Sequence, residues 1–273
     1  AILWFPHREK SQAPLWIIRG FVHNRAIIRL PFEEVFQAVV FQSICFLLRY
    51  GRFLRYNQRV SRCQGRSTGN DQSLANPDST GIRDSIPLHD ILKSNGACFG
   101  EAAGWERPNW YTSTNQEAKY EYSYGRQNWF ENVREECEAV RSNIGLFELT
   151  SFSKFIIKGK DSTNYLNHVC VSNMDTSIGK VTYTQLLNED AGTEADITIT
   201  RLENNKYLYV TAPTSHNKDL FWLQFHSKKF KNLEITDVTK NYGCLSLMGP
   251  RSRAFLQTLL NVDISNESIP FGY

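Results

Sequence analysis

The sequence predicts an α+β fold from about Ile86 onward, preceded by an irregular linker and a poorly ordered N-terminal extension. Beyond Ile86, segments with a two-residue hydrophobic period alternate with segments of helical period, and most connections between them are short. The chain is 41% hydrophobic and 13% aromatic, which is enough to form a core. By contrast, residues 65–85 are rich in Ser, Gly, Asn and Asp, a composition typical of a flexible linker.

Residues 1–85 are expected to form an unassigned, basic and partly disordered extension. Residues 1–96 contain 13 Lys and Arg against 7 Asp and Glu, whereas the net charge of the whole chain is only +3. This excess suits nucleic acid, a membrane surface, a targeting leader or a solvated extension. Aromatics interleave with arginines in residues 49–66, but one basic segment is a weak signal, so nucleic acid is not an expected partner.

Several classes of protein are disfavoured by composition. The apolar run 35–48 is shorter than the ~18 residues of a membrane span, so it predicts a buried or interfacial helix and no span. The six cysteines form no C-x-x-C pair, which disfavours a zinc site and a disulfide-stapled secreted scaffold. The six histidines show no metal-ligand spacing either, and no metal is expected.

Residues 100–111 and 122–130 combine seven aromatic residues with three glycines and one proline. This mixture fits neither a regular amphipathic helix nor an alternating strand. We therefore expect ordered but irregular chain, with indole N–H and phenol O–H groups bonded to the backbone.

The elements of the last 150 residues follow from their hydrophobic spacing. The predicted helices are 132–141, 162–169, 215–228 and 251–260. The predicted strands are 152–157, 181–187, 195–202, 206–211, 233–238 and 243–248. Asp161 is the expected N-cap of the second helix. Residues 188–192 are expected to form a hairpin loop between two of the strands.

Asp196 is the candidate for chemistry within this pattern. It lies near the start of the predicted strand 195–202, where Asp196, Thr198 and Thr200 share one face. Aspartate is a poor strand former, so its position there needs a reason. A solvated face or a turn at the strand start is one explanation. A carboxylate that is directed into a cavity, where it bonds a ligand amine, is the other.

Residues 187–202 resemble the signature loop of the glycine-cleavage T-protein fold. That pattern is Leu-Asn, a polar spacer, Gly-Gly-Ile, two variable residues, Asp and a β-branched strand. Ala191 replaces the first glycine of the pattern and Thr193 replaces its apolar residue. The first replacement matters if this backbone position requires a positive φ.

Further matches follow in order along residues 86–273. Residues 87–101, 140–155, 181–186 and 248–253 resemble segments of the mitochondrial sarcosine and dimethylglycine dehydrogenases. Similar segments occur in a non-catalytic relative of these enzymes, the regulatory subunit of pyruvate dehydrogenase phosphatase. The resemblance implies that residues 86–130 end the central linker domain of that family. It also implies that residues 131–273 form the N-terminal half of a folate-binding domain like that of the glycine-cleavage T-protein.

The resemblance further implies a tetrahydrofolate site and its residues. In the family, the aspartate of the signature loop lies beside the reactive folate nitrogens and assists one-carbon transfer, and Asp196 matches it. The implied folate-binding residues are Tyr183, Asn188, Gly192, Asp196 and Arg201. The location implied by the relatives is the mitochondrial matrix.

Amine oxidation is not expected of this sequence. The flavin-binding fold of these dehydrogenases requires G-x-G-x-x-G between a strand and a helix, and the sequence has no such motif, so FAD is not expected. Three interpretations remain open: a truncated dehydrogenase that retains the folate step, a regulatory protein without chemistry, and a fragment without stable function. Because half a domain leaves apolar faces uncovered, self-association is also expected.

Overall fold

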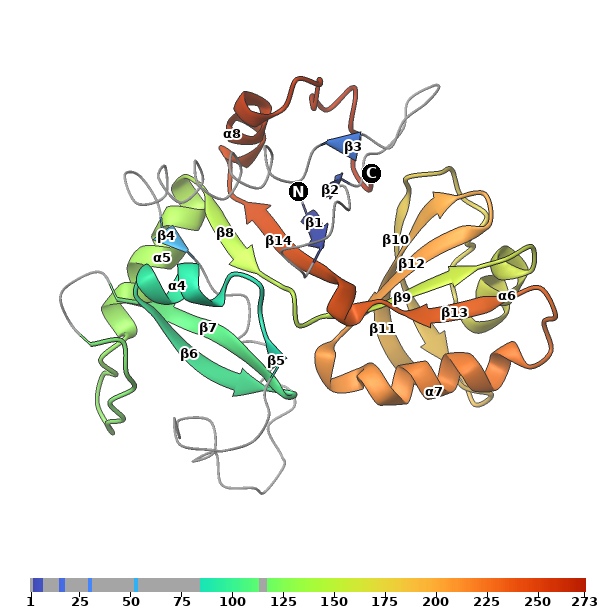
Figure 1. Ribbon diagram of the computed structural model, residues 1–273, viewed down its shortest axis with the longest axis horizontal. Coiled ribbons are helices and arrows are strands. Elements are labelled where there is room, and N and C mark those ends of the chain that lie inside the picture. The colour runs from blue at the N-terminus through green and yellow to red at the C-terminus, as the bar shows by residue number, and fades with distance from the viewer. Residues whose placement is uncertain (1, 7–14, 18–28, 31–51, 54–83, 113–116) are drawn as a thin grey trace. The chain divides into compact units, whose positions relative to one another are not determined.

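The computed structural model in Figure 1 describes residues 2–6, 15–17, 29–30, 52–53, 84–112 and 117–273. The described chain divides into two compact units. The first contains residues 84–112, 117–150 and 243–261, and the second contains residues 151–242 and 262–273. The α+β prediction is confirmed, because both units combine helices with sheets.

The second unit is built on a five-stranded antiparallel sheet with the order β10-β11-β12-β9-β13. Its strands are β9 (Ser153–Lys158), β10 (Val181–Leu187), β11 (Thr193–Glu203), β12 (Lys206–Thr211) and β13 (Glu234–Asp237). Its helices are α6 (Ser162–Val169) and α7 (His216–Ser227), with short 3-10 turns at Pro213–Ser215 and Thr239–Asn241. Each predicted helix and strand of this unit is confirmed to within three residues at either end.

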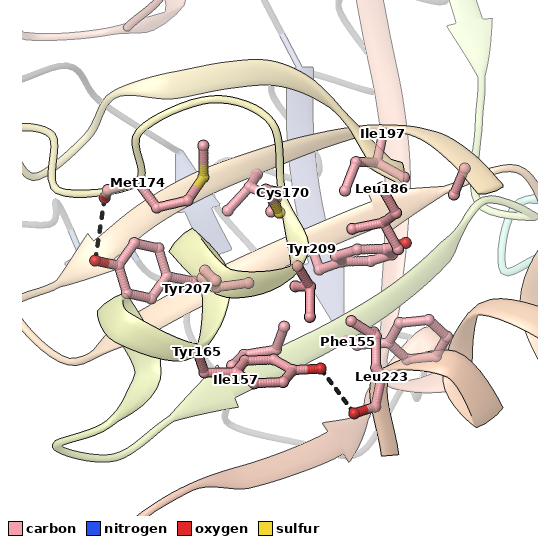
Figure 2. Close-up of a cluster of buried hydrophobic side chains, with 14 residues drawn as sticks. Phe155, Ile157, Tyr165, Cys170, Met174, Leu186, Ile197, Tyr207, Tyr209 and Leu223 are labelled. Carbon is pink, nitrogen blue, oxygen red and sulfur yellow. Dashed lines mark hydrogen bonds between the residues drawn. The ribbon is translucent and has the colours of Figure 1, made fainter. Parts of the chain in front are cut away.

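One face of this sheet carries the hydrophobic core. Alternation along β11 directs Ile197 and Ile199 inward, where both are buried. Helices α6 and α7 cover the same face, and they contribute Tyr165 and Leu223 to the cluster that Figure 2 shows. The Tyr165 hydroxyl donates a hydrogen bond of 2.7 Å to the Leu223 carbonyl, so the polar end of a buried aromatic is satisfied. The opposite face of β10 and β11 carries Tyr183, Gln185, Asp196 and Thr198.

Two sheets contribute to the first unit. In one, β14 (Tyr242–Met248) pairs antiparallel with β8 (Gly145–Glu148), and β4 (Arg52–Phe53) pairs parallel with β8. The other has the order β5-β7-β6. Its strands are β5 (Asp84–Ser85), β6 (Ala97–Ala102) and β7 (Trp105–Tyr111). The helices of this unit are α4 (His89–Ser94), α5 (Phe130–Ser142) and α8 (Ser252–Leu259). The strands β1 (Ile2–Pro6), β2 (Leu15–Ile17) and β3 (Arg29–Leu30) extend the sheet of β14 and β8, whose order is β3-β2-β1-β14-β8-β4.

The prediction of irregular chain was wrong for residues 100–111, which form most of a β-hairpin. Trp105 and Trp110 are buried in it, so packing outweighs the poor local pattern. The register shifts opposite Cys98 and Phe99, and Pro108 lies at this bulge, where a missing N–H is tolerated. Among the described residues, the buried indole N–H of Trp110 finds no hydrogen-bond partner, contrary to expectation. Residues 122–129 contain no helix or strand, as predicted.

Asp161 occupies the N-cap position of α6, but its side chain makes no capping hydrogen bond. Instead its Oδ2 accepts a hydrogen bond of 2.9 Å from the backbone N–H of Asn232. The expected cap is therefore wrong in mechanism, because the carboxylate serves a contact between two distant turns.

Other expectations concern residues outside the described part of the chain. The run 35–48 belongs to this group. So do the basic segment 49–66 apart from residues 52–53, which form β4, and the linker 65–85 apart from residues 84–85, which form β5. Among the residues that the structure describes, no helix is both long and apolar enough to cross a bilayer.

Candidate functional site

Asp196 lies on the outer face of β11, opposite the core. Its side chain is exposed, whereas its neighbours Ala195 and Ile197 are buried with 8% and 2% of their surface accessible. This arrangement follows directly from the two-residue period of the strand. A carboxylate at this position is exposed to solvent and open to a ligand.

Two side chains of β10 hold the Asp196 carboxylate. The Tyr183 hydroxyl donates to Oδ2 over 2.6 Å, and Gln185 Nε2 donates to Oδ1 over 3.1 Å. Gln185 is the direct register partner of Asp196, and Tyr183 is paired with Thr198 one step along the same face. Each carboxylate oxygen thus has one fixed donor. Since each can accept a further hydrogen bond, the group remains able to bind an N–H of a ligand.

Tyr183 provides the only large exposed aromatic surface on β10 and β11. It retains 62% of its surface although its hydroxyl is engaged. An exposed ring beside a carboxylate can pack against a planar heterocycle while the carboxylate bonds that heterocycle's nitrogen. The pair therefore offers both a stacking surface and an anionic acceptor.

The loop between β10 and β11 is organised by Asn188. Its Oδ1 accepts hydrogen bonds from the backbone N–H groups of Asp190 and Gly192, and its Nδ2 donates to Glu194 over 3.0 Å. A Cβ at Gly192 would lie 2.9 Å from Asn188 Nδ2, so a larger residue would displace this side chain. The structure gives Asn188 and Gly192 the role of shaping the hairpin that carries Asp196.

Ala191 adopts a positive φ of 60° in this loop. This is the position at which the signature pattern has glycine, and the condition under which that replacement matters is met. A residue with a Cβ is strained in the left-handed region, because the Cβ approaches a carbonyl oxygen.

Replacing Ala191 by glycine is expected to stabilise the protein by about 0.5–1 kcal/mol. The relief of left-handed strain exceeds the extra conformational entropy that glycine brings to the unfolded chain. Denaturant unfolding followed by circular dichroism measures the difference. Ala212, at φ −61°, is the matched control, and Ala212→Gly is expected to destabilise. A loss of stability in Ala191→Gly would contradict the strain argument.

Arg201, which the resemblance implied as a folate ligand, is engaged elsewhere. Its guanidinium is 2.7 Å from Asp175, bonds the Thr176 carbonyl, and donates to the Asn204 carbonyl over 3.1 Å. It lies an odd number of residues from Asp196 on β11, so alternation directs the two side chains to opposite faces. The structure brings together Tyr183 and Asp196, with Asn188 and Gly192 in the adjoining loop, and leaves Arg201 apart.

Gln185 is the residue of this site that sequence reasoning missed. The strand 181–187 was predicted, but no residue in it other than Tyr183 was assigned to the site. The signal that could have found Gln185 is its position directly across the hairpin from Asp196, which depends on the register.

A family model described as the GCVT N-terminal domain matches residues 88–273. The chain is 38% identical over 182 residues to a 4-methylaminobutanoate oxidase (formaldehyde-forming) of Paenarthrobacter nicotinovorans. This alignment covers 67% of this chain and 22% of the oxidase. It is 33% identical over 187 residues to the mitochondrial dimethylglycine dehydrogenase of Mus musculus, in an alignment that covers 67% of this chain and 21% of the dehydrogenase. It is 31% identical over 188 residues to an aminomethyltransferase of Staphylococcus saprophyticus, in an alignment that covers 68% of this chain and 46% of the aminomethyltransferase.

Among solved structures, the chain resembles a glycine cleavage system aminomethyltransferase T from Bartonella henselae. The TM-score is 0.54 at 23% sequence identity, over 65% of this chain and 44% of that one, which establishes a likeness of fold. The match spans about a fifth of the length of the oxidase and the dehydrogenase, and less than half of the aminomethyltransferases.

Proposed function

Because this chain belongs to the GCVT N-terminal domain family, we propose that its second unit binds tetrahydrofolate at Tyr183 and Asp196 and takes part in one-carbon transfer. The observation that supports this most directly is the exposed Asp196 carboxylate, held by two donors from β10 and still able to accept a ligand N–H. The proposal extends to the mitochondrial location and to a division of the chain at residues 85/86 and 130/131.

The proposed role of Asp196 follows from the chemistry of the transfer. When a folate nitrogen attacks the carbon of a C=N or C=O electrophile, a C–N bond forms, the π electron pair moves onto the heteroatom of the electrophile, and the folate nitrogen loses a proton. A carboxylate within hydrogen-bond reach of that nitrogen can accept the proton and stabilise the positive charge that develops. Tyr183 and Gln185 fix the carboxylate's orientation, which lowers the cost of aligning it with the nitrogen.

Tetrahydrofolate titrated into the purified chain is expected to bind saturably in a calorimeter. In Asp196→Asn the affinity is expected to fall by about 10- to 100-fold, the worth of a hydrogen bond to a charged group. Asp190→Asn is the control, because this exposed loop carboxylate makes no side-chain hydrogen bond among the described residues. Equal affinity of the wild type and Asp196→Asn would overturn the assignment of Asp196.

A regulatory role without chemistry is the second candidate, and Ala191 favours it. Ala191 adopts the left-handed conformation at the position where the signature pattern has glycine, so the loop carries strain that a glycine would avoid. This candidate predicts a folded chain that binds no tetrahydrofolate. Circular dichroism on the titrated sample separates that outcome from loss of binding through unfolding.

A further inference from the structure

The outer face of α7 carries exposed aromatic and basic side chains that no part of the folate site uses. In Figure 1, α7 runs along the outside of the second unit. Its inner side is fixed to the core by Leu223 and Asp219, which are both buried. The opposite side presents Lys218, Phe221, Phe225 and Lys228, spaced by three or four residues, so that they form one stripe. We call these four residues the lysine–phenylalanine face.

The two phenylalanines project outward to an unusual degree. Phe221 retains 68% of its surface and Phe225 retains 53%. Their rings are stacked with centroids 6.1 Å apart, so they form one continuous apolar surface rather than two scattered contacts. Contiguous exposed apolar surface, especially with a polar rim, indicates an interaction site.

The rim of this apolar surface is basic. Lys228 lies over the Phe225 ring at 5.2 Å, and Lys229 and Lys231 follow directly after the helix. In the part of the chain that the structure describes, Lys228, Lys229 and Lys231 form no ion pair. The carboxylate within α7, that of Asp219, is buried beneath the helix. Lys218 is partly neutralised, since its Nζ lies 3.9 Å from Glu194 and 3.4 Å from Asp219. The uncompensated positive charge therefore gathers at the C-terminal end of the face.

We propose that the lysine–phenylalanine face of α7 docks on an anionic lipid surface. Phe221 and Phe225 enter the boundary between headgroups and acyl chains, and Lys228, Lys229 and Lys231 contact lipid phosphates. Lysine stems reach along apolar surface while their ammonium groups stay at the headgroups, which suits their position beside the aromatic pair. An amphipathic helix that lies in the interface needs no spanning length, so the absence of a long apolar helix among the described residues is compatible with this mode.

The positive charge of the lysine–phenylalanine face disfavours a second copy of the chain as its binding partner. A symmetric contact through this face would place the same lysines of two copies against one another, at a cost in repulsion. An acidic protein surface would complement the lysines but would leave the stacked phenylalanines without an apolar partner. A lipid bilayer with anionic headgroups satisfies both parts of the face.

Co-sedimentation of the full chain with vesicles tests this proposal. We expect binding to phosphatidylcholine vesicles that contain phosphatidylserine, little binding to pure phosphatidylcholine, and weaker binding as salt is raised. Lys228→Gln with Lys229→Gln is expected to lower the partition coefficient about 25-fold, from about fivefold per lysine. Phe221→Ser with Phe225→Ser is expected to lower it by at least about tenfold.

Matched variants identify the face. Phe271 is fully exposed elsewhere in the second unit, and Phe271→Ser is expected to bind vesicles like the wild type. Lys93 and Lys240 are exposed lysines outside α7, and their paired change to Gln removes the same charge with an expected loss of less than about threefold. Failure to bind anionic vesicles, equal losses in the controls, or binding of a single-stranded oligonucleotide in place of vesicles would each overturn the proposal. Dimers that the Phe221/Phe225 variant abolishes would also overturn it, because they would assign the face to a second copy.

Discussion

Replacing Gly159 by alanine is expected to destabilise the protein by about 3–5 kcal/mol. Gly159 has a φ of 125°, a conformation that residues with a Cβ rarely adopt. A Cβ there would lie 2.1 Å from the Asn232 carbonyl oxygen and 3.1 Å from the Leu233 Cα. Both obstacles are backbone, so no side-chain rotation relieves the clash. Chemical denaturation followed by circular dichroism measures the loss.

The clash at Gly159 involves a contact that ties two turns together. The backbone N–H of Asp161 donates to the Asn232 carbonyl, and the Asp161 carboxylate accepts from the Asn232 N–H. Moving residue 232 to admit a methyl group would break both bonds. Gly104 is the matched control: its φ is 80°, and a Cβ there would meet nothing within 4 Å. Gly104→Ala is expected to cost only about 1 kcal/mol of backbone strain. Equal losses at the two glycines would contradict the steric argument.

Replacing Asp219 by alanine is expected to cost about 3–4 kcal/mol of stability. Asp219 is 1% exposed on the inner side of α7, and its Oδ2 accepts hydrogen bonds from the Tyr209 hydroxyl at 3.1 Å and the Thr211 hydroxyl at 2.6 Å. Both hydroxyl-bearing residues are buried, so loss of the carboxylate leaves two donors without a partner. Thermal or denaturant unfolding of the full chain measures the effect.

The behaviour of Tyr209 supports the same network. Burial raises the pKa of Tyr209 well above its ordinary value, and the negative charge of Asp219 raises that pKa further. The tyrosine is therefore a neutral donor to the carboxylate at all moderate pH values. In a background of Tyr209→Phe with Thr211→Val, Asp219→Ala is expected to cost clearly less, since no donor is orphaned. An unchanged cost in that background would show that the hydrogen bonds are not the source of the stability.

Local hydrophobic spacing was sufficient to predict the second unit. In the strand that contains Ile197 and Ile199, apolar and polar residues alternate because one face packs on the core and the other does not. This alternation is visible in the sequence alone. Helix 162–169 was predicted for the analogous reason at helical period. Helix 215–228 was also predicted, although its apolar residues are spread over several faces and Phe221 and Phe225 are exposed.

The hairpin of β6 and β7 was missed because its stability comes from outside its local pattern. Trp105 and Trp110 are buried by packing that no window of sequence contains. Pro108 opposes strand formation except at a bulge, and the position of a bulge cannot be seen before the partner strand is known. The sequence rules for strands therefore failed where tertiary contacts overrule propensity.

The candidate site was predicted in part for a similar reason. The unusual strand position of Asp196 pointed to it, and the resemblance added Tyr183. Gln185 could not be predicted from the sequence, because a register shift between Leu186 and Leu187 determines which residue of β10 pairs with Asp196. A pairing without that shift would place Thr184 opposite Asp196, and a slip of one residue turns a side chain to the other face.

The central claim is that Tyr183 and Asp196 act as one site for tetrahydrofolate. A double-mutant cycle measures it most directly, with calorimetric affinities for the wild type, Tyr183→Phe, Asp196→Asn and the double variant. Because the Tyr183 hydroxyl orients the carboxylate, we expect each single change to weaken binding and the double variant to bind about as weakly as Asp196→Asn alone. Unaltered affinity in Asp196→Asn, or absence of binding by a folded wild-type chain, would contradict the claim.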